Sequence, residues 1–365
     1  MKLSIGIVGL PNVGKSTLFN ALLKKQIANV ANYPFCTIEP NVGIIEVPDE
    51  RLPVLAKIVN TTKIVPAVVE FYDIAGLVRG ASHGEGLGNK FLSHIREVEA
   101  IIHVVRLFED SNVVHVSDKI NPVDDIKTIE TELILADLET LQKVKNQKAK
   151  VKIESEKLKV EMAEKLIEVL NKGNPARNVN LTDEQKIAIK PLNLLTIKPV
   201  VYVFNVSETQ LQKKEESEKK IDEILNSVGN KHFCSLHLCA KMESEIVIFN
   251  EEEQKEYLKQ FALVESGLNC LVKKSYEILG LISFLTAGTL EARAWTIKKS
   301  TLAPQAAGVI HTDFEKKFIK ADVIPYQQFV DSGGWVPARE QGLVQTVGRD
   351  YEMNGGEVVE FKIGA

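Results

Sequence analysis

A glycine-rich turn between an apolar strand and a helix constrains the fold of this chain more than any other feature. Residues 5–8 are apolar or glycine, and they run into Gly9-Leu10-Pro11-Asn12-Val13-Gly14-Lys15-Ser16. Apolar residues then recur at helical spacing over 18–23. The glycines let the backbone curl, so that successive N–H groups and the helix N-terminus point at one anion. The spacing predicts a phosphate-binding loop of the Walker A type.

The residue types in this loop predict contacts with a nucleoside triphosphate and Mg²⁺. Lys15 is expected to reach the β- and γ-phosphates and to serve catalysis, and Ser16 is expected to ligate Mg²⁺. The residues expected to contact the nucleotide here are Asn12, Val13, Gly14, Lys15, Ser16 and Thr17.

Length and composition indicate a multidomain globular protein. The chain has 365 residues, which suggests two or three domains, and its net charge of −4 gives no whole-molecule attraction to nucleic acid or anionic lipid. Its four cysteines form no C-x-x-C pair, which is typical of free thiols in a reducing compartment. Because no apolar run approaches the ~20 residues of a membrane span and no signal peptide precedes the first strand, a cytoplasmic location without membrane contact is expected.

Two further motifs predict the remaining metal and γ-phosphate contacts. Thr37 lies in a proline-flanked loop at the distance from Lys15 where a switch I threonine closes on Mg²⁺. The strand Val68 to Tyr72 ends in Asp73-x-x-Gly76. Asp73 is expected to hold the metal in the Walker B role, and the Gly76 N–H to bond the γ-phosphate. The predicted Mg²⁺ set is therefore Ser16, Thr37 and Asp73.

The residue after Gly76 raises the question of how water is positioned. Ras-type GTPases carry a glutamine there, whereas this chain has Leu77, whose side chain cannot orient water. His115, in the loop after the buried strand 100–107, is one candidate for a catalytic role. A K⁺ ion held with the help of Asn12 is a second candidate. The alternative to both is that His115 and Asn12 have purely structural roles. His103, inside the strand, is expected to be a core residue.

A helical region interrupts the predicted sheet. Apolar residues recur at helical spacing from Ile126 and again from Leu158. Thr182-x-x-Gln185 predicts a capping box that opens another helix. The pattern indicates an α-helical hairpin, whose segment Lys143 to Lys165 holds eight lysines against four glutamates. That segment is either a solvated helix tip or an RNA-binding surface.

The next buried strand carries the motif that predicts the base. The strand from Pro199 to Phe204 is followed directly by Asn205-Val206-Ser207-Glu208. These residues are expected at the carboxyl end of the strand, where open α/β sheets bind ligands. GTPases carry Asn-Lys-x-Asp here, and the aspartate accepts two N–H bonds from guanine. Since Val206 replaces the lysine and Glu208 the aspartate, adenine is the better fit. Lys241 in Cys239-Ala240-Lys241 is expected to contact the base as well.

The residues after Leu281 predict a separate β-rich unit. Segments 284–288, 292–297 and 358–361 have strand composition. A short amphipathic helix carrying Lys316, Lys317, Phe318 and Lys320 is expected between them. Strands at both ends around one helix are typical of a ubiquitin-like β-grasp.

The whole chain resembles the YchF, or Obg-like ATPase, subfamily of translation-factor-related P-loop NTPases. The resemblance rests on Gly9 to Thr17, Asn32 to Thr37, Asp73 to Ser82 and Asn205 to Glu208. The segment from Ala303 to Phe314 is similar to the TGS domain of that family. The resemblance implies an α/β G-type domain with a mostly parallel sheet over 1–125 and 199–280. It also implies an inserted helical hairpin over 126–198 and a TGS domain over 281–365.

The same resemblance implies ATP preferred over GTP and association with ribosomes or ribosomal subunits. We expect a Mg²⁺-dependent ATPase with slow turnover, monomeric and without DNA as a partner. An open alternative is a nucleotide-gated binding module in which hydrolysis is incidental. An ordinary metabolic kinase is disfavoured, because no motif for a second substrate is present.

Overall fold

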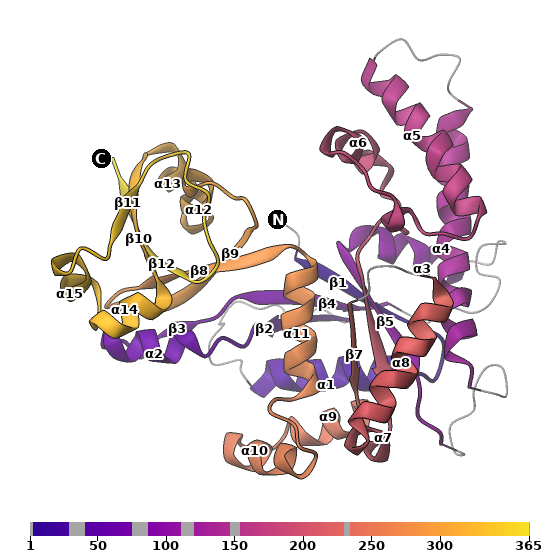
Figure 1. Ribbon diagram of the computed structural model, residues 1–365, viewed down its shortest axis with the longest axis horizontal. Helices are drawn as coiled ribbons and strands as arrows, with labels where there is room; N and C mark the ends of the chain where they lie inside the picture. Colours follow the sequence, from indigo (N-terminus) through magenta and orange to yellow (C-terminus); the bar gives the residue numbers. More distant parts are fainter. Residues whose placement is uncertain are drawn as a thin grey trace. The chain divides into compact units, whose positions relative to one another are not determined.

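The structure, a computed structural model, describes residues 3–28, 41–74, 87–110, 120–146, 154–229 and 234–364. For residues 28, 87–89 and 154–155 the backbone alone is described. The chain forms two compact units. The first consists of residues 1–25, 38–43 and 70–271, and the second of residues 26–37, 44–69 and 272–365. Figure 1 labels the elements, and each unit is described by itself.

The first unit is built on a six-stranded sheet of order β2-β4-β1-β5-β6-β7. Its strands are β1 (Ser4–Val8), β2 (Val42–Glu46), β4 (Val68–Asp73), β5 (Ala100–Arg106), β6 (Val200–Asn205) and β7 (Cys234–Leu238). The pairs β4–β1, β1–β5, β5–β6 and β6–β7 are all parallel, which confirms the predicted mostly parallel sheet. Every residue of β1, β5 and β6 is buried, as in strands with both faces covered.

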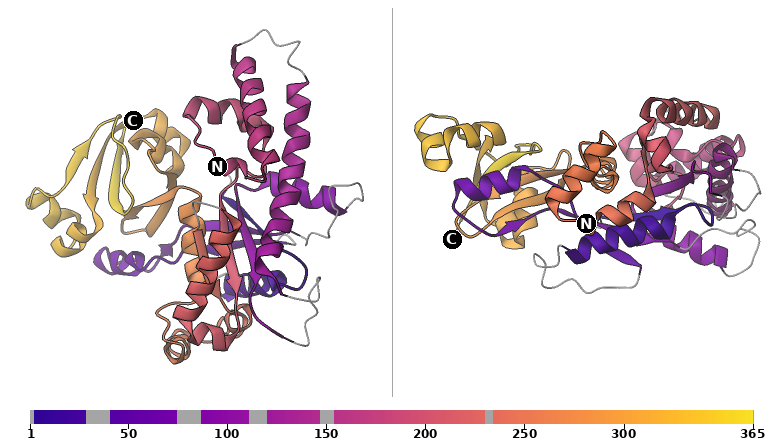
Figure 2. Two further views of the ribbon diagram at one scale, coloured as in Figure 1. Left: turned by 45° about the vertical axis from the view of Figure 1, so that its right-hand side comes forward. Right: turned by 90° about the horizontal axis from the view of Figure 1, so that it is seen from below.

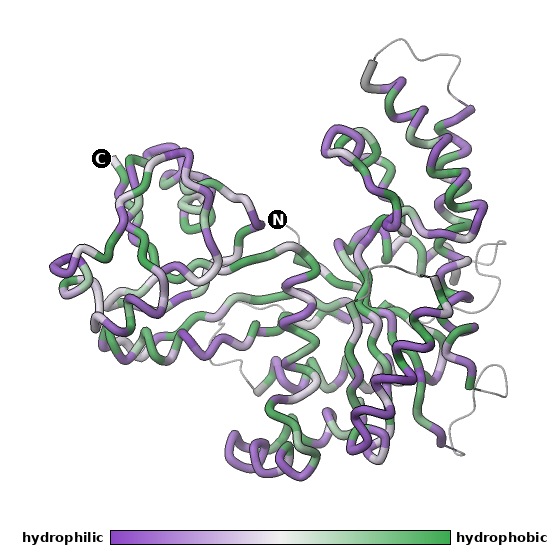
Figure 3. Tube along the Cα trace, in the orientation of Figure 1, coloured by the Kyte–Doolittle hydropathy of each residue, from purple (hydrophilic) through white to green (hydrophobic). Residues whose placement is uncertain are grey.

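Helices connect and cover these strands. They are α1 (Lys15–Ala28), α3 (Leu87–Glu97), α4 (Pro122–Lys145), α5 (Glu154–Asn171), α6 (Asp183–Ile189), α7 (Glu208–Gln212), α8 (Lys214–Val228), α9 (Ala240–Ile246) and α10 (Glu251–Gln260). A further helix, α11 (Gly267–Ile278), begins in this unit, and its residues from 272 onward belong to the second. Two 3₁₀ turns span Ala176–Asn178 and Lys190–Leu192. Figure 3 shows the division of polarity, with apolar residues along the central strands and hydrophilic residues over most of α10.

The inserted helices pack as a hairpin. α4 and α5 lie side by side (Figure 2), and their shared core includes Leu141, Met162 and Leu166. α4 begins at Pro122 rather than at 126, because Asn121 caps the helix by accepting from the Asp124 N–H. The capping box predicted at Thr182 and Gln185 is present at the start of α6.

Buried polar groups fix this hairpin to the sheet. Asp137 of α4 is fully buried and accepts the Leu195 and Thr196 N–H groups, each at 2.8 Å, and the Thr196 hydroxyl at 2.6 Å. Arg177 donates to Glu130 of α4, and Tyr202 of β6 donates to the same carboxylate at 2.9 Å. The segment that leads into β6 is thereby held by α4.

The second unit contains a mixed sheet of order β11-β10-β12-β8-β9-β3. Its strands are β3 (Ile64–Val65), β8 (Leu281–Ala287), β9 (Ala292–Lys298), β10 (Phe318–Pro325), β11 (Gln345–Val347) and β12 (Glu357–Ile363). Its helices are α2 (Arg51–Ile58), α12 (Ala303–Ile310), α13 (Thr312–Lys316), α14 (Tyr326–Ser332) and α15 (Trp335–Glu340). The parallel pair β8–β12 between antiparallel pairs β8–β9 and β10–β12 is the β-grasp arrangement.

Two features of this unit differ from the sequence-based expectation. The helix predicted through Lys320 is wrong: α13 ends at Lys316, and Phe318 and Lys320 lie in β10. Pairing with β12 and burial of Phe318 in the sheet core stabilise the strand there. In addition, residues 47–67, placed by the sequence in the G-type domain, belong to this unit, where β3 pairs with β9.

Removal of the Asp137 carboxylate is expected to destabilise the first unit strongly. Asp137→Ala leaves three buried donors without an acceptor, so the free energy of unfolding should fall by about 3 kcal/mol. Glu139→Ala is the matched control on the same helix, because its side chain is 71% exposed and pairs with Lys143 at the surface; its cost should stay within about 0.5 kcal/mol. Urea unfolding measures the free energy of unfolding of both variants. An equal loss in the two would contradict the structural role of the Asp137 carboxylate.

Candidate functional site

The phosphate-binding loop lies at the carboxyl end of β1, between that strand and α1. Gly9 packs so closely that an added Cβ would lie 2.5 Å from the Val104 carbonyl oxygen. Gly14 has a φ of +101°, and a Cβ there would meet the Asn205 amide. Asn12 adopts the left-handed conformation with φ 61°, which asparagine tolerates better than most residues. The two glycines are therefore required by close approach and by conformation.

Lys15 and Asp73 form the charged centre of this loop. The Lys15 ammonium donates to the Leu10 carbonyl oxygen at 2.7 Å, and the side chain is buried. Burial lowers the pKa of Lys15 to about 8, although the nearby Asp73 carboxylate opposes the shift. Burial likewise raises the pKa of Asp73, and Lys15 opposes that change. Each group thus favours the charged form of the other.

The described residues fit a Mg²⁺ ion of the kind held jointly by protein and phosphate. Asp73 ends β4 beside Ile7 of β1, and Ser16 lies exposed on the first turn of α1. Among the described residues, no group of three or more His, Cys, Asp or Glu side chains could hold a metal. Mg²⁺ commonly takes one or two protein oxygens together with substrate phosphates, so this pair of ligands suits it. Thr37 and Gly76 lie outside the described residues.

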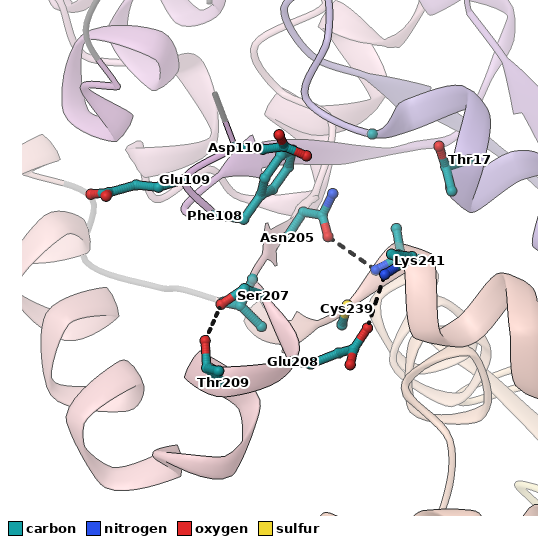
Figure 4. Close-up of a pocket in the computed structure, with 13 residues that line it drawn as sticks. Thr17, Phe108, Glu109, Asp110, Asn205, Ser207, Glu208, Thr209, Cys239 and Lys241 are labelled. Carbon is teal, nitrogen blue, oxygen red and sulfur yellow. Dashed lines mark hydrogen bonds and ion pairs between the residues drawn. The ribbon is translucent and has the colours of Figure 1, made fainter. Parts of the chain in front are cut away.

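Next to the loop, a cavity of about 400 Å³ opens at the carboxyl ends of β5, β6 and β7. Figure 4 shows its lining residues. They are Gly14, Thr17, Phe108, Glu109, Asp110, Asn205, Val206, Ser207, Glu208, Thr209, Cys239, Ala240 and Lys241. The structure therefore brings the predicted residues Asn205, Val206, Glu208 and Lys241 to one cavity that continues from the phosphate loop.

Asn205 joins the walls of this cavity. Its amide nitrogen donates to the Val13 carbonyl oxygen at 2.9 Å, and its amide oxygen accepts from the Ala240 N–H at 3.0 Å. The side chain is 5% exposed. Both ends of the amide are engaged by the protein, so Asn205 positions the two loops around the cavity.

One wall of the cavity was not predicted from the sequence. Phe108, Glu109 and Asp110 follow β5, and the buried Arg106 shapes their loop. Its guanidinium donates to the Phe108 carbonyl oxygen at 3.2 Å and to the Asp110 carbonyl oxygen at 3.3 Å. The signal that could have found them is their position directly after a fully buried parallel strand.

Of the two histidines considered from the sequence, His103 lies in the described part of the chain. It is 2% exposed and packs 5.5 Å from the Tyr202 ring, which confirms it as a core residue. Its burial lowers its pKa to about 3, so it stays neutral. His115 lies outside the described residues.

The sheet order, the loop and the cavity define a P-loop nucleotide-binding protein of the GTPase type. A family described as "50S ribosome-binding GTPase" matches residues 4–133, and the YchF-GTPase_C family, described as "Protein of unknown function (DUF933)", matches residues 281–364. The "Ribosome-binding ATPase YchF" of Bacillus subtilis is 49% identical over 365 residues, covering 99% of each chain. That of Haemophilus influenzae is 47% identical over 365 residues with the same coverage.

A solved structure agrees with these relatives. "Structure of the Schizosaccharomyces pombe YchF GTPase" matches with a TM-score of 0.88 and 38% identity, covering 99% of this chain and 98% of that one. The chain belongs to the YchF family, which confirms the resemblance seen in the sequence. None of the helices in the described ranges has the length and apolar character to span a membrane.

Triphosphate affinity is expected to fall as the pH rises above 8. A bound phosphate favours the charged form of Lys15, so binding requires proton uptake once the free lysine, with a pKa of about 8, has lost its proton. The dissociation constant should then rise by up to about tenfold per pH unit. Lys15→Arg, which stays charged throughout, is the control and should show no such dependence. Calorimetric titration with a non-hydrolysable triphosphate from pH 7 to 9 measures this dependence. A dissociation constant that does not change with pH for the parent chain would contradict the lowered pKa of Lys15.

Proposed function

We propose that the chain is a Mg²⁺-dependent ATPase that prefers ATP to GTP, turns over slowly and associates with ribosomes. The observation that carries the proposal is Glu208 beside Lys241 in the cavity that continues from the phosphate loop. A GTPase would hold guanine there with an aspartate. The bacterial relatives are named ATPases, whereas the solved yeast relative is named a GTPase, so base choice is the property to measure first.

The residues of the loop divide the phosphate chemistry between them. Lys15 neutralises charge at the β- and γ-phosphates, while Ser16 and Asp73 hold Mg²⁺ together with Thr37. Mg²⁺, when bound, would neutralise negative charge on the phosphate oxygens and so lower their repulsion of the attacking water. The Gly76 N–H bonds the γ-phosphate. The cavity residues Asn205, Val206, Glu208 and Lys241 surround the base.

Turnover is slow because Leu77 replaces the water-orienting glutamine. Two candidates for that task follow from the sequence, His115 and a K⁺ ion held with the help of Asn12. The left-handed backbone of Asn12 supports a special role for an asparagine in the loop. Comparing turnover in K⁺ and in Na⁺, for the parent chain and for His115→Ala, separates the two.

Association with the ribosome is proposed from the names of the relatives, and a cytoplasmic location follows from it. We further propose that the protein is a monomer. The β-grasp unit corresponds to a TGS domain. Because the net charge is −4, contact with ribosomal RNA must use local lysines. If hydrolysis is incidental, the chain is a nucleotide-gated binding module, and Lys15→Ala and a hydrolysis-deficient variant then differ in their cellular effect.

Base choice is expected to follow residues 206 and 208. The parent chain should bind ATP more tightly than GTP, and Val206→Lys combined with Glu208→Asp should shift the ratio toward GTP by about tenfold to a hundredfold, the worth of a bidentate contact. Val206→Met, which adds length without charge, is the control and should leave the ratio unchanged. Equilibrium titration with both nucleotides measures the ratio of the two dissociation constants. A clear GTP preference of the parent chain would refute the ATPase assignment.

Ribosome association is expected to depend on exposed lysines of the hairpin or of the β-grasp unit. Lys145, Lys157 and Lys165 form one set, and Lys316, Lys317 and Lys320 the other; all six are exposed. Changing one set to glutamine should weaken co-sedimentation with ribosomal subunits. The salt slope of binding should fall by about 0.7–0.9 for each phosphate that is no longer neutralised.

The control for this experiment comes from another exposed helix. Lys214, Lys219 and Lys220 of α8 are exposed as well, and their replacement by glutamine should have no effect. Co-sedimentation is compared with ATP and with ADP. If both lysine sets can be removed together without any change, the ribosome-binding surface lies elsewhere.

A further inference from the structure

A second cavity lies within the β-grasp unit, and the proposed function gives it no role. Its volume is about 470 Å³, and all of its lining residues belong to the second unit. The rings of Phe314 (α13), Trp335 (α15) and Phe361 (β12) line it, together with Ile310 of α12 (Figure 1). Leu290, in the turn between β8 and β9, lines it too and is 85% exposed. A cavity with this much aromatic and apolar surface is suited to an apolar ligand group.

The sheet is incomplete beside this cavity. β8 and β12 run parallel and pair at Leu285 and Val358. In this register the last residue of β8, Ala287, lies beside Glu360. The chain then turns into β9, whereas β12 runs on to Ile363. The final residues of β12 therefore extend past the end of the neighbouring strand.

The backbone groups of these final residues point to the side where β8 has ended. The Gly364 N–H donates to the Lys317 carbonyl oxygen at 2.8 Å, next to the pair Phe318–Ile363. Ile363 is thus in a non-hydrogen-bonded pair with β10. Since backbone groups alternate along a strand, Phe361 and Ile363 turn their N–H and C=O groups away from β10. They form a short open strand edge next to the cavity.

The end of β8 is held by a side chain instead of by strand pairing. The Ala287 carbonyl oxygen accepts the Trp335 indole N–H at 3.1 Å. This bond satisfies a carbonyl group that continued pairing with β12 would otherwise satisfy. The indole also fixes α15 at the cavity wall, so the opening between β8 and β12 is a built feature of the unit.

The charged residues that line the cavity are paired within the protein. Arg339 lies 3.4 Å from Asp322 and also pairs with Glu360, while Glu291 pairs with Lys63 at 2.6 Å. The cavity therefore presents apolar surface and backbone groups with little net charge. An RNA strand carries a negative charge at each phosphate and is bound through basic side chains. The charge of this lining matches an uncharged, apolar peptide instead.

We propose that the cavity binds an extended, uncharged segment of a partner protein. The segment adds as a strand to the open edge of β12 and places an apolar side chain against Phe314 and Trp335. Backbone hydrogen bonds to Phe361 and Ile363 hold the segment, and the cavity selects the side chain. The bound segment also covers Leu290. Because this binding requires no nucleotide, the site goes beyond the proposed function and does not depend on it.

The test begins with random peptides of about nine residues, the length of a long strand, displayed on phage and selected on the full chain. The selected sequences should be uncharged and should alternate apolar residues with others. One selected peptide is then synthesised with blocked ends. Its dissociation constant is measured from the emission of Trp335, one of two tryptophans in the chain. Since no charge is used, the constant should stay the same between about 50 and about 200 mM salt.

A charge at the apolar rim of the cavity should weaken the binding of this peptide. Leu290→Asp should raise the dissociation constant by about tenfold or more, because an ionised carboxylate would have to be covered by the peptide. The fold should not change, since the leucine is exposed. Val264→Asp is the matched control, because Val264 is 99% exposed, belongs to the first unit and does not line the cavity. Its affinity should equal that of the parent chain.

A proline at the open edge tests the strand addition. Ile363→Pro removes an N–H group that faces away from β10, so the pairing of β10 with β12 is kept. The dissociation constant should rise by about threefold to tenfold, the worth of one backbone hydrogen bond. Ile363→Val keeps the N–H group and should bind as the parent chain does. Nucleotide affinity should be the same in all of these variants.

Three results would overturn the inference. The first is that no peptide is selected, or that Leu290→Asp binds the peptide as tightly as the parent chain. The second is equal binding by Ile363→Pro and Ile363→Val, which would show that the peptide does not add to the strand edge. The third is binding of a single-stranded oligouridylate in place of peptides, lost in Leu290→Asp and steeply dependent on salt, which would show that the cavity takes a nucleobase.

Discussion

The two hydrogen bonds of the Asn205 amide hold the nucleotide site together. One fixes the Val13 carbonyl oxygen of the phosphate loop, and the other fixes the Ala240 N–H at the start of α9. Because the amide is buried at the end of a fully buried strand, it cannot exchange these partners for water without cost. The phosphate loop, the base cavity and the Glu208–Lys241 pair therefore share one anchor. A displacement of β6 would therefore move the phosphate loop and the base cavity together.

The helical hairpin is attached to the same strand. Tyr202 lies three residues before Asn205 on β6 and bonds Glu130 of α4, which also receives Arg177. A buried ion pair of this kind adds little net stability but is costly to break, so it fixes orientation more than it strengthens the fold. The hairpin base and the nucleotide site are thereby linked through one rigid strand.

Local pattern was sufficient for much of the fold and for the phosphate half of the site. The loop from Gly9 to Ser16 and the buried strands over 100–107 and 199–204, observed as β5 and β6, were predicted because their periodicity and spacing are local properties. The helix expected through Lys320 was wrong, since pairing with β12 outweighed the local helical pattern. The wall formed by Phe108 to Asp110 was missed, because it becomes part of the cavity only when β5 and β6 lie side by side.

The sequence by itself determined the phosphate loop, the order of apolar strands and the replacement of the guanine-binding aspartate by Glu208. Each of these features can be recognised within a short continuous segment of the chain. The tertiary structure alone decided that residues 47–67 belong to the unit that contains the C-terminal sheet, because the pairing of β3 with β9 joins positions more than two hundred residues apart. It also decided what Asn205 does. The folded chain engages both ends of its amide with the backbone of two other loops, and only the meeting of three strand ends creates that arrangement.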